Sequence, residues 1–123
     1  MVLGIGMDIV EIDRIKKAVA KEAFLTRVYS ADEIAYCKSR GKGSDESFAG
    51  RFAAKEAVLK AFGTGLRNGS LQDIEILNDS LGCPMVKLSG WYEEFAVQKG
   101  VKSVWISISH SRHNAVAQCV LEG

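Results

Sequence analysis

Residues 51–65, RFAAKEAVLKAFGTG, carry an apolar pattern that fits one buried face of an α-helix. Apolar side chains recur there at intervals of three and four residues, the spacing that aligns them along a helix. These residues are Ala54, Ala57, Val58, Ala61 and Phe62. We predict a helix from about Ser47 to Phe62. Gly63 and Gly65 follow it, and glycine commonly ends a helix because it adopts the left-handed backbone of a C-terminal cap without strain.

The same helix carries four charged residues in its middle. Glu56 and Lys60 are four residues apart and lie nearly opposite the apolar stripe. Arg51 and Lys55 form a second pair, turned by about 100° from the first. In one interpretation these are ordinary surface charges, with an ion pair worth about 0.2–0.5 kcal/mol between Glu56 and Lys60. In the other interpretation, the cations Arg51, Lys55 and Lys60 bind an anionic ligand. The helix alone does not decide between these two interpretations.

The rest of the chain predicts an α+β domain with helices packed on one face of a mainly antiparallel sheet. In chain order we expect a strand over 2–12, helices over 13–27 and from Ser30 to before 41–44, the helix above, strands over 71–77 and 84–88, a helix over 91–99, and strands over 103–109 and 114–121. Ser30 and Glu33 fit a capping box at the start of the second helix. The last four strands form two hairpins.

The first strand has two different faces. Leu3, Ile5, Met7 and Ile9 alternate with Gly4, Gly6 and Asp8, so we expect a half-buried strand. Glycine inside a strand costs stability and often marks close approach by a ligand or another backbone. Asp8 is therefore either a solvated acid on an edge strand or a ligand in a cleared space. With Glu56 it could bind Mg²⁺, which prefers oxygen ligands and keeps waters that substrate phosphates replace.

Composition limits the function classes. With 123 residues and 47% apolar residues, the chain suits one domain spanning 1–123. A net charge of +1 gives no general attraction to nucleic acid or membrane. No apolar run approaches the roughly 20 residues of a membrane span, and no leader pattern precedes the first strand, so we expect a cytoplasmic protein. Cys37, Cys83 and Cys119 are scattered, which predicts reduced thiols and neither a disulfide framework nor a zinc site.

Four motifs together resemble one enzyme family. They are MDIVEI with Asp8, FAGRFAAKEAVLKAFGTG with Glu56 and Lys60, Gly82-Cys83-Pro84 before a strand, and ISISHS with His110. A lone histidine after a strand is more often a turn residue than a ligand. His110 is therefore a candidate binding residue only because the other three motifs accompany it. In this order the motifs resemble the holo-acyl-carrier-protein synthases, the short bacterial 4′-phosphopantetheinyl transferases of fatty-acid synthesis. The resemblance extends from about residue 2 to residue 121.

The resemblance implies a Mg²⁺-dependent reaction. The 4′-phosphopantetheine arm of coenzyme A would pass to a serine of apo-acyl carrier protein, and adenosine 3′,5′-bisphosphate would be released. It implies that Asp8 and Glu56 bind the Mg²⁺ and that Lys60 neutralises, and can protonate, the leaving bisphosphate. The serine proton would pass either to Glu56 or to a metal-bound water, and the sequence does not choose between them.

The resemblance also implies a set of coenzyme A contacts. They are Arg51, Lys60, Gly63, Gly65, Pro84, Ser109 and His110. Arg51 and His110 would hold the 3′-phosphate end of the nucleotide, and Pro84 would form the rim of the adenine pocket. Cys83 is a departure, because many members carry a lysine between this glycine and proline. Its absence removes a charge contact while the turn itself should persist.

Two kinds of protein contact follow from the resemblance. The acidic helix of acyl carrier protein would dock on a basic surface, and Arg14, Lys17 and Lys21 share one face of the helix expected over 13–27, with Phe24 just beyond. An ordinary solvated basic face is the alternative. The family also implies a homotrimer with active sites at subunit boundaries, which suits a small domain that buries a sheet face against copies of itself.

Two other functions remain open at this stage. One is a non-catalytic module that binds Mg²⁺ and coenzyme A without transfer, and the other is a scaffold that only docks acyl carrier protein. The metal, leaving-group and nucleotide positions occur together, which favours the enzyme because a scaffold does not need them.

Overall fold

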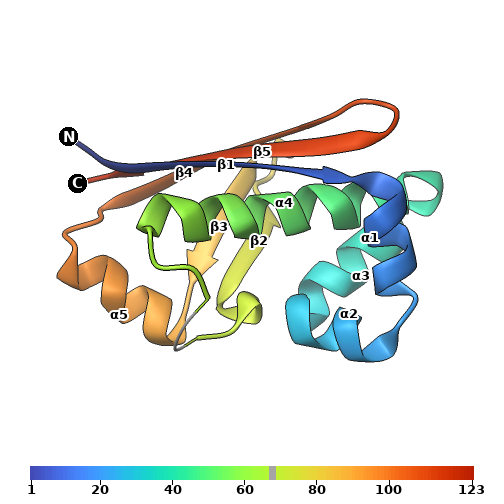
Figure 1. Ribbon diagram of the computed structural model, residues 1–123, viewed down its shortest axis with the longest axis horizontal. Helices are drawn as coiled ribbons and strands as arrows, with labels where there is room; N and C mark the ends of the chain where they lie inside the picture. Colours follow the sequence, from blue (N-terminus) through green and yellow to red (C-terminus); the bar gives the residue numbers. More distant parts are fainter. Residues whose placement is uncertain (67–68) are drawn as a thin grey trace.

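The computed structural model describes residues 1–66 and 69–123 and places the long helix α4 (Ser44–Phe62) at the centre of the molecule (Figure 1). The helix begins earlier than the predicted Ser47, and every residue of its apolar stripe is buried. At its end Gly63 has a φ of 77°, and its N–H donates to the carbonyl oxygen of Leu59 at 3.0 Å. The predicted glycine cap is therefore confirmed.

A three-stranded antiparallel sheet lies across α4. Its strands, in spatial order, are β1 (Val2–Glu11), β5 (Asn114–Glu122) and β4 (Ser103–His110). Gly4 and Gly6 of β1 face the helix, and a Cβ at Gly6 would lie 2.0 Å from the carbonyl oxygen of Ala57. The close approach that these glycines predicted is thus to another backbone, that of α4.

The opposite face of this sheet is apolar and exposed. Ile5, Met7 and Ile9 of β1 are 69%, 62% and 63% exposed, and Trp105 of β4 is 59% exposed. Figure 1 shows the helices gathered on the other side of the sheet. The half-buried strand is confirmed, and its buried side is the one with the glycines and Asp8, which faces α4.

The remaining strands form a separate hairpin sheet. β2 (Ile74–Asn78) follows the short 3₁₀ helix η2 (Leu71–Asp73) and pairs antiparallel with β3 (Pro84–Leu88). Helix α5 (Gly90–Gln98) follows β3. The predicted hairpin is confirmed, and the strands divide into two antiparallel sheets within the predicted α+β class. The hairpin lies below α4 and away from the open sheet face (Figure 1).

The N-terminal region contains three short helices. They are α1 (Ile12–Val19), α2 (Glu22–Val28) and α3 (Ala31–Ser39), and the 3₁₀ helix η1 (Gly41–Gly43) then leads into α4. The single helix predicted over 13–27 was wrong, because Lys21 has an extended backbone and interrupts it. The capping box of α3 is confirmed: the Ser30 hydroxyl accepts from the Glu33 N–H at 3.2 Å, and the Glu33 carboxylate accepts from the Ser30 N–H at 2.9 Å.

A buried ion pair joins α3 and α4 to the segment that begins the hairpin. The ammonium of Lys55 donates to Glu33 Oε1 at 2.8 Å and to the carbonyl oxygens of Leu71 and Ile74 at 2.8 and 2.7 Å. Glu33 Oε2 accepts from the Ile76 N–H at 3.0 Å. Burial lowers the pKa of Lys55, and the charge of Glu33 opposes this shift. Lys55 is fully buried, so the hypothesis that it meets an anionic ligand was wrong.

Candidate active site

An acid and a lysine meet where β1 passes the C-terminal half of α4. Asp8 Oδ1 accepts a hydrogen bond from Lys60 Nζ at 2.8 Å, and the same ammonium donates to the carbonyl oxygen of Met7 at 3.1 Å. The Asp8 side chain is 14% exposed and that of Lys60 54% exposed, so the acid lies against the helix while the lysine lies at the surface. Among the described residues, Lys60 thus forms its ion pair with Asp8 and not the ordinary helical pair with Glu56.

Glu56 belongs to the same corner. Burial raises the pKa of Glu56, the charge of Asp8 raises it further, and Lys60 opposes both. The hydrogen bond to Asp8 raises the pKa of Lys60. Two carboxylates that repel each other beside one cation are typical of a functional site that attracts further positive charge.

These residues fit a hard divalent cation. The carboxylates of Asp8 and Glu56 and the carbonyl of Met7 offer oxygen donors, and the ammonium of Lys60 already binds two of these groups as a cation would. No cluster of three or more Asp, Glu, His or Cys side chains suited to a metal occurs in the described part of the chain. A site with two carboxylates leaves positions for water and phosphate, as Mg²⁺ prefers.

A cavity of about 480 Å³ opens beside this corner. It is lined by Glu56, Leu59, Lys60, Gly63, Gly65 and Leu66. Gly63 and Gly65 have φ values of 77° and 67°, and a Cβ at either position would meet no atom within 4 Å. The predicted glycines therefore line open space, and the turn requires their positive φ.

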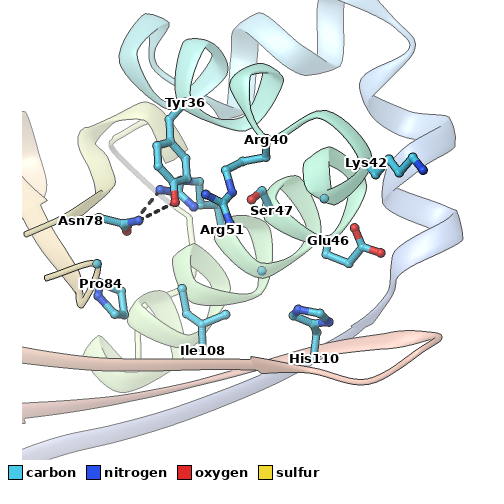
Figure 2. A pocket seen from close by; sticks show the side chains of 13 residues that line it. Tyr36, Arg40, Lys42, Glu46, Ser47, Arg51, Asn78, Pro84, Ile108 and His110 are labelled. Atoms are coloured by element: carbon cyan, nitrogen blue, oxygen red, sulfur yellow. Dashed lines mark hydrogen bonds between the residues drawn. The ribbon is translucent and has the colours of Figure 1, made fainter.

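A second cavity, of about 610 Å³, lies at the N-terminal half of α4 (Figure 2). Arg51, Pro84 and His110, three of the predicted nucleotide contacts, all line it. Ser109 does not, because neighbouring residues of a strand point to opposite sides: Ile108 and His110 face the cavity, and Ser109 lies on the open face of the sheet.

Arg51 is the most buried cation of this second cavity. It is 6% exposed, its guanidinium carbon lies 4.2 Å from the centre of the Tyr36 ring, and its Nη2 donates to Asn78 Oδ1 at 3.3 Å. Its Nε is buried and has no hydrogen-bond partner among the described residues. A buried donor without a partner is costly, which points to a ligand with acceptor oxygens such as a phosphate.

Six other polar lining residues were missed from the sequence: Tyr36, Arg40, Lys42, Glu46, Ser47 and Asn78. Lys42 stands between two glycines just before α4, and Asn78 opens the hairpin turn, so both offered a local signal. Tyr36 and Arg40 offered none, because the side of α3 that meets the cavity depends on how α3 packs against α4.

The two cavities lie on opposite sides of α4. Asp8 is on β1 and His110 on β4, and β5 lies between these two edge strands. Because adjacent strands are about 4.8 Å apart, the edges are separated by roughly 10 Å. None of the described residues lines both cavities. One chain thus presents the carboxylate corner (Asp8, Glu56 and Lys60) and the second cavity, here called the cationic cavity for its Arg40, Lys42 and Arg51, at separate places.

The predicted docking residues do not share one helix. Arg14 and Lys17 lie on α1, whereas Lys21 lies in the break before α2. All three are exposed. Phe24 is half-buried, with its ring centre 5.9 Å from that of Phe52, so part of this side chain serves the core. An exposed basic surface remains, although not the single helical face that was expected.

Comparisons with known proteins agree along the whole chain. A family model described as the 4′-phosphopantetheinyl transferase superfamily matches residues 4–119. The holo-[acyl-carrier-protein] synthase of Clostridium tetani is 50% identical over 125 residues, covering 100% of this chain and 98% of the relative. That of Ruminiclostridium cellulolyticum is 49% identical over 120 residues, covering 95% and 90%.

Solved structures are similar to the same extent. The Helicobacter pylori holo-[acyl-carrier-protein] synthase in complex with coenzyme A has a TM-score of 0.84 at 38% identity, covering 96% of this chain and 99% of that one. The enzyme from Neisseria meningitidis has a TM-score of 0.90 at 35% identity and covers 100% of both chains. This chain therefore belongs to the holo-[acyl-carrier-protein] synthase family of the 4′-phosphopantetheinyl transferase superfamily.

Proposed function

We infer that this chain transfers the 4′-phosphopantetheine arm of coenzyme A to a serine of apo-acyl carrier protein and releases adenosine 3′,5′-bisphosphate. The observation that carries this inference is the corner formed by Asp8, Glu56 and Lys60, in a chain similar to holo-[acyl-carrier-protein] synthases over its whole length. The residues 1–123 would act as one domain.

The chemistry needs positioning and charge neutralisation more than covalent help. The serine oxygen would bond to the phosphorus that carries the pantetheine arm, and the bond from that phosphorus to the bridging oxygen would break. Asp8 and Glu56 would hold a Mg²⁺ ion, which when bound draws charge from the diphosphate. Lys60 would donate a hydrogen bond to the leaving bisphosphate. The serine proton would pass either to Glu56 or to a metal-bound water beside it.

The nucleotide end of coenzyme A would occupy the second cavity. Arg51 and His110 would bind the 3′-phosphate, and Pro84 would form the rim around the adenine. The buried, unpaired Nε of Arg51 supports this assignment, because a phosphate oxygen would supply the acceptor that the described residues lack. Gly63 and Gly65 would line the path of the arm beside Lys60.

The complete site would form between copies of the chain, in a homotrimer. Within one chain the carboxylate corner and the cationic cavity lie on opposite sides of α4, so coenzyme A would reach both if a second copy supplied one of them. Ser109, on the open sheet face, would then lie at the boundary. The exposed apolar face of Ile5, Met7, Ile9 and Trp105 would be the surface that the copies bury.

Light scattering tests this assembly. Met7→Glu places a charge in the centre of the open face and should shift the protein to a smaller species with little transferase activity. Val97→Glu is the control, because Val97 is 73% exposed on α5, away from that face. A wild-type protein that is monomeric at micromolar concentration and fully active would contradict a shared site.

Acyl carrier protein would dock on the basic surface of Arg14, Lys17 and Lys21 beside Phe24. Replacing the three cations with Glu should raise the KM for carrier protein sharply and leave the KM for coenzyme A nearly unchanged, because attraction becomes repulsion only at the docking surface. The wild-type kcat/KM should also fall as salt rises. An unchanged KM for carrier protein in the triple variant would place docking elsewhere.

The decisive test is incubation of the purified protein with apo-acyl carrier protein, coenzyme A and Mg²⁺. Mass spectrometry should find carrier protein heavier by one 4′-phosphopantetheinyl group. Asp8→Ala and Glu56→Gln should abolish the transfer and weaken Mn²⁺ binding while circular dichroism stays unchanged. More than about a tenth of the wild-type rate, about 1.4 kcal/mol of barrier, would contradict the metal assignment. Coenzyme A binding without a mass increase would instead support a non-catalytic module.

A cytoplasmic location is part of the proposal, since coenzyme A and carrier protein are both needed. The structure adds one relevant fact: no helix in the described ranges is long and apolar enough to cross a membrane. Three unpaired cysteines also fit a reducing compartment.

A further inference from the structure

Tyr36 of α3 lines the cationic cavity and is itself uncharged. Its ring lies against two guanidinium groups, with the Arg51 carbon 4.2 Å and the Arg40 carbon 5.7 Å from the ring centre. Both distances are within the range of a cation–π contact. Figure 2 shows the two arginines converging beside this ring from α4 and from the end of α3. The ring thus gathers two like charges that would otherwise repel each other.

The Tyr36 hydroxyl is also linked to Arg51 through the side chain of Asn78. It accepts a hydrogen bond from Asn78 Nδ2 at 2.8 Å, and Asn78 Oδ1 accepts from Arg51 Nη2 at 3.3 Å. Arginine can only donate, so the amide oxygen must face Arg51 and the amide nitrogen must face Tyr36. The three side chains therefore form a closed triangle in which Tyr36 touches both other members (Figure 2).

This triangle restricts a side chain that has many rotamers. An arginine that is free to move loses considerable conformational entropy when it binds a ligand. Here the ring of Tyr36 and the amide of Asn78 hold the guanidinium beforehand, and its buried Nε is left without a partner among the described residues. Arg51 is therefore oriented before any ligand arrives, with one donor still to be satisfied.

We propose that Tyr36 is a positioning residue that orients Arg51 in the coenzyme A site and thereby sets the preference for coenzyme A over 3′-dephospho-coenzyme A. The inference rests on the proposed contact between Arg51 and the 3′-phosphate. Tyr36 does not touch the transferred phosphoryl group in this arrangement. Its effect should fall on substrate binding, and kcat should not change.

The test compares the KM and kcat of Tyr36→Phe for both substrates. The variant keeps the ring and removes the hydrogen bond from Asn78, whose loss should raise the KM for coenzyme A about fivefold. The KM for 3′-dephospho-coenzyme A should not change, because that substrate lacks the group that Arg51 binds. Tyr36→Leu also removes the ring and should raise the KM for coenzyme A further.

Ser39→Ala is the matched control. It removes a hydroxyl from the same helix, one that donates to the backbone carbonyl oxygen of Tyr36 at 2.6 Å and does not line the cavity. It should leave both KM values unchanged. Thermal unfolding of each variant shows whether a change in KM accompanies a general loss of stability.

Arg51→Met separates failure of this inference from failure of the proposed function. If Arg51→Met leaves the preference for coenzyme A intact, the proposed 3′-phosphate contact is wrong, and the role of Tyr36 is refuted with it. If Arg51→Met abolishes the preference but Tyr36→Phe leaves both KM values unchanged, only the inference about Tyr36 is refuted. An equal rise in KM for both substrates in Tyr36→Phe also refutes it, because the pocket has then loosened as a whole.

Discussion

The close contact between β1 and α4 predicts a large effect from one added methyl group. In Gly6→Ala, the new Cβ would lie 2.0 Å from the carbonyl oxygen of Ala57 and 2.6 Å from the nitrogen of Ala61. Both are backbone atoms, so no change of rotamer relieves the contact. Real Cβ contacts below 3.0 Å are essentially never seen, so strand and helix must separate by about 1 Å, the difference between 3.0 and 2.0 Å.

This displacement should reach the carboxylate corner. Asp8 is two residues further along the same strand, and its bond to Lys60 is 2.8 Å long in the undisturbed protein. A misplacement of about 1 Å can lower a rate about 100-fold, and overpacking costs about 1–3 kcal/mol of stability. We expect kcat/KM for carrier-protein modification to fall about 100-fold, and the unfolding midpoint to fall by about 4–12 °C.

The assay follows the coenzyme A-dependent mass increase of apo-acyl carrier protein at saturating Mg²⁺ and at equal protein concentrations. Gly43→Ala is the control for the unfolding measurement, because a Cβ there would be 3.9 Å from Arg40 Cβ, an ordinary contact. If Gly6→Ala keeps more than a third of the wild-type kcat/KM and an unchanged midpoint, the strand–helix contact does not position Asp8.

Three further variants test other parts of the structure. Lys55→Met should cost about 3–5 kcal/mol in urea unfolding at pH 8, because Glu33 is left as a buried unpaired charge. Glu56→Gln should make the metal-free protein at least as stable as wild type at pH 8, because burial and Asp8 raise the pKa of Glu56 and so disfavour its charged form in the fold. This advantage should shrink as pH falls through the raised pKa, where wild-type Glu56 becomes neutral, and calorimetry in a chelator measures it. Cys83→Ser should leave activity unchanged, since the thiol is exposed and only weakly bonded, and a strong loss would assign it a role.

Local signals in the sequence predicted much of the fold. The cap residues Ser30 and Gly63, the apolar stripe of α4 and the two hairpins were all recognised, because each depends on residues close together in the chain. The break at Lys21 was missed because neither glycine nor proline marks it.

Other features depend on partners far away in the chain. Lys55 has its acid 22 residues earlier, on α3, so its burial could not be read from the helix that carries it. Likewise, the alternation in β1 gave the two faces of the strand but not which one meets α4. Family motifs marked Asp8 and Glu56, which the structure places together beside Lys60, whereas no local signal marked Tyr36, because its contact with Arg51 depends on how α3 packs against α4.

The pairing of β1 with β5 has a consequence for the order of folding. Asp8 pairs opposite Ala117, so the strand that carries the first carboxylate is made early and finds its partner strand only when residues 114–122 have left the ribosome. At about 5–20 residues per second, the early strand waits several seconds with the backbone groups of its edge unpaired. We expect slow folding, governed by this long-range pairing, and a nascent chain that needs protection from aggregation until β5 is in place.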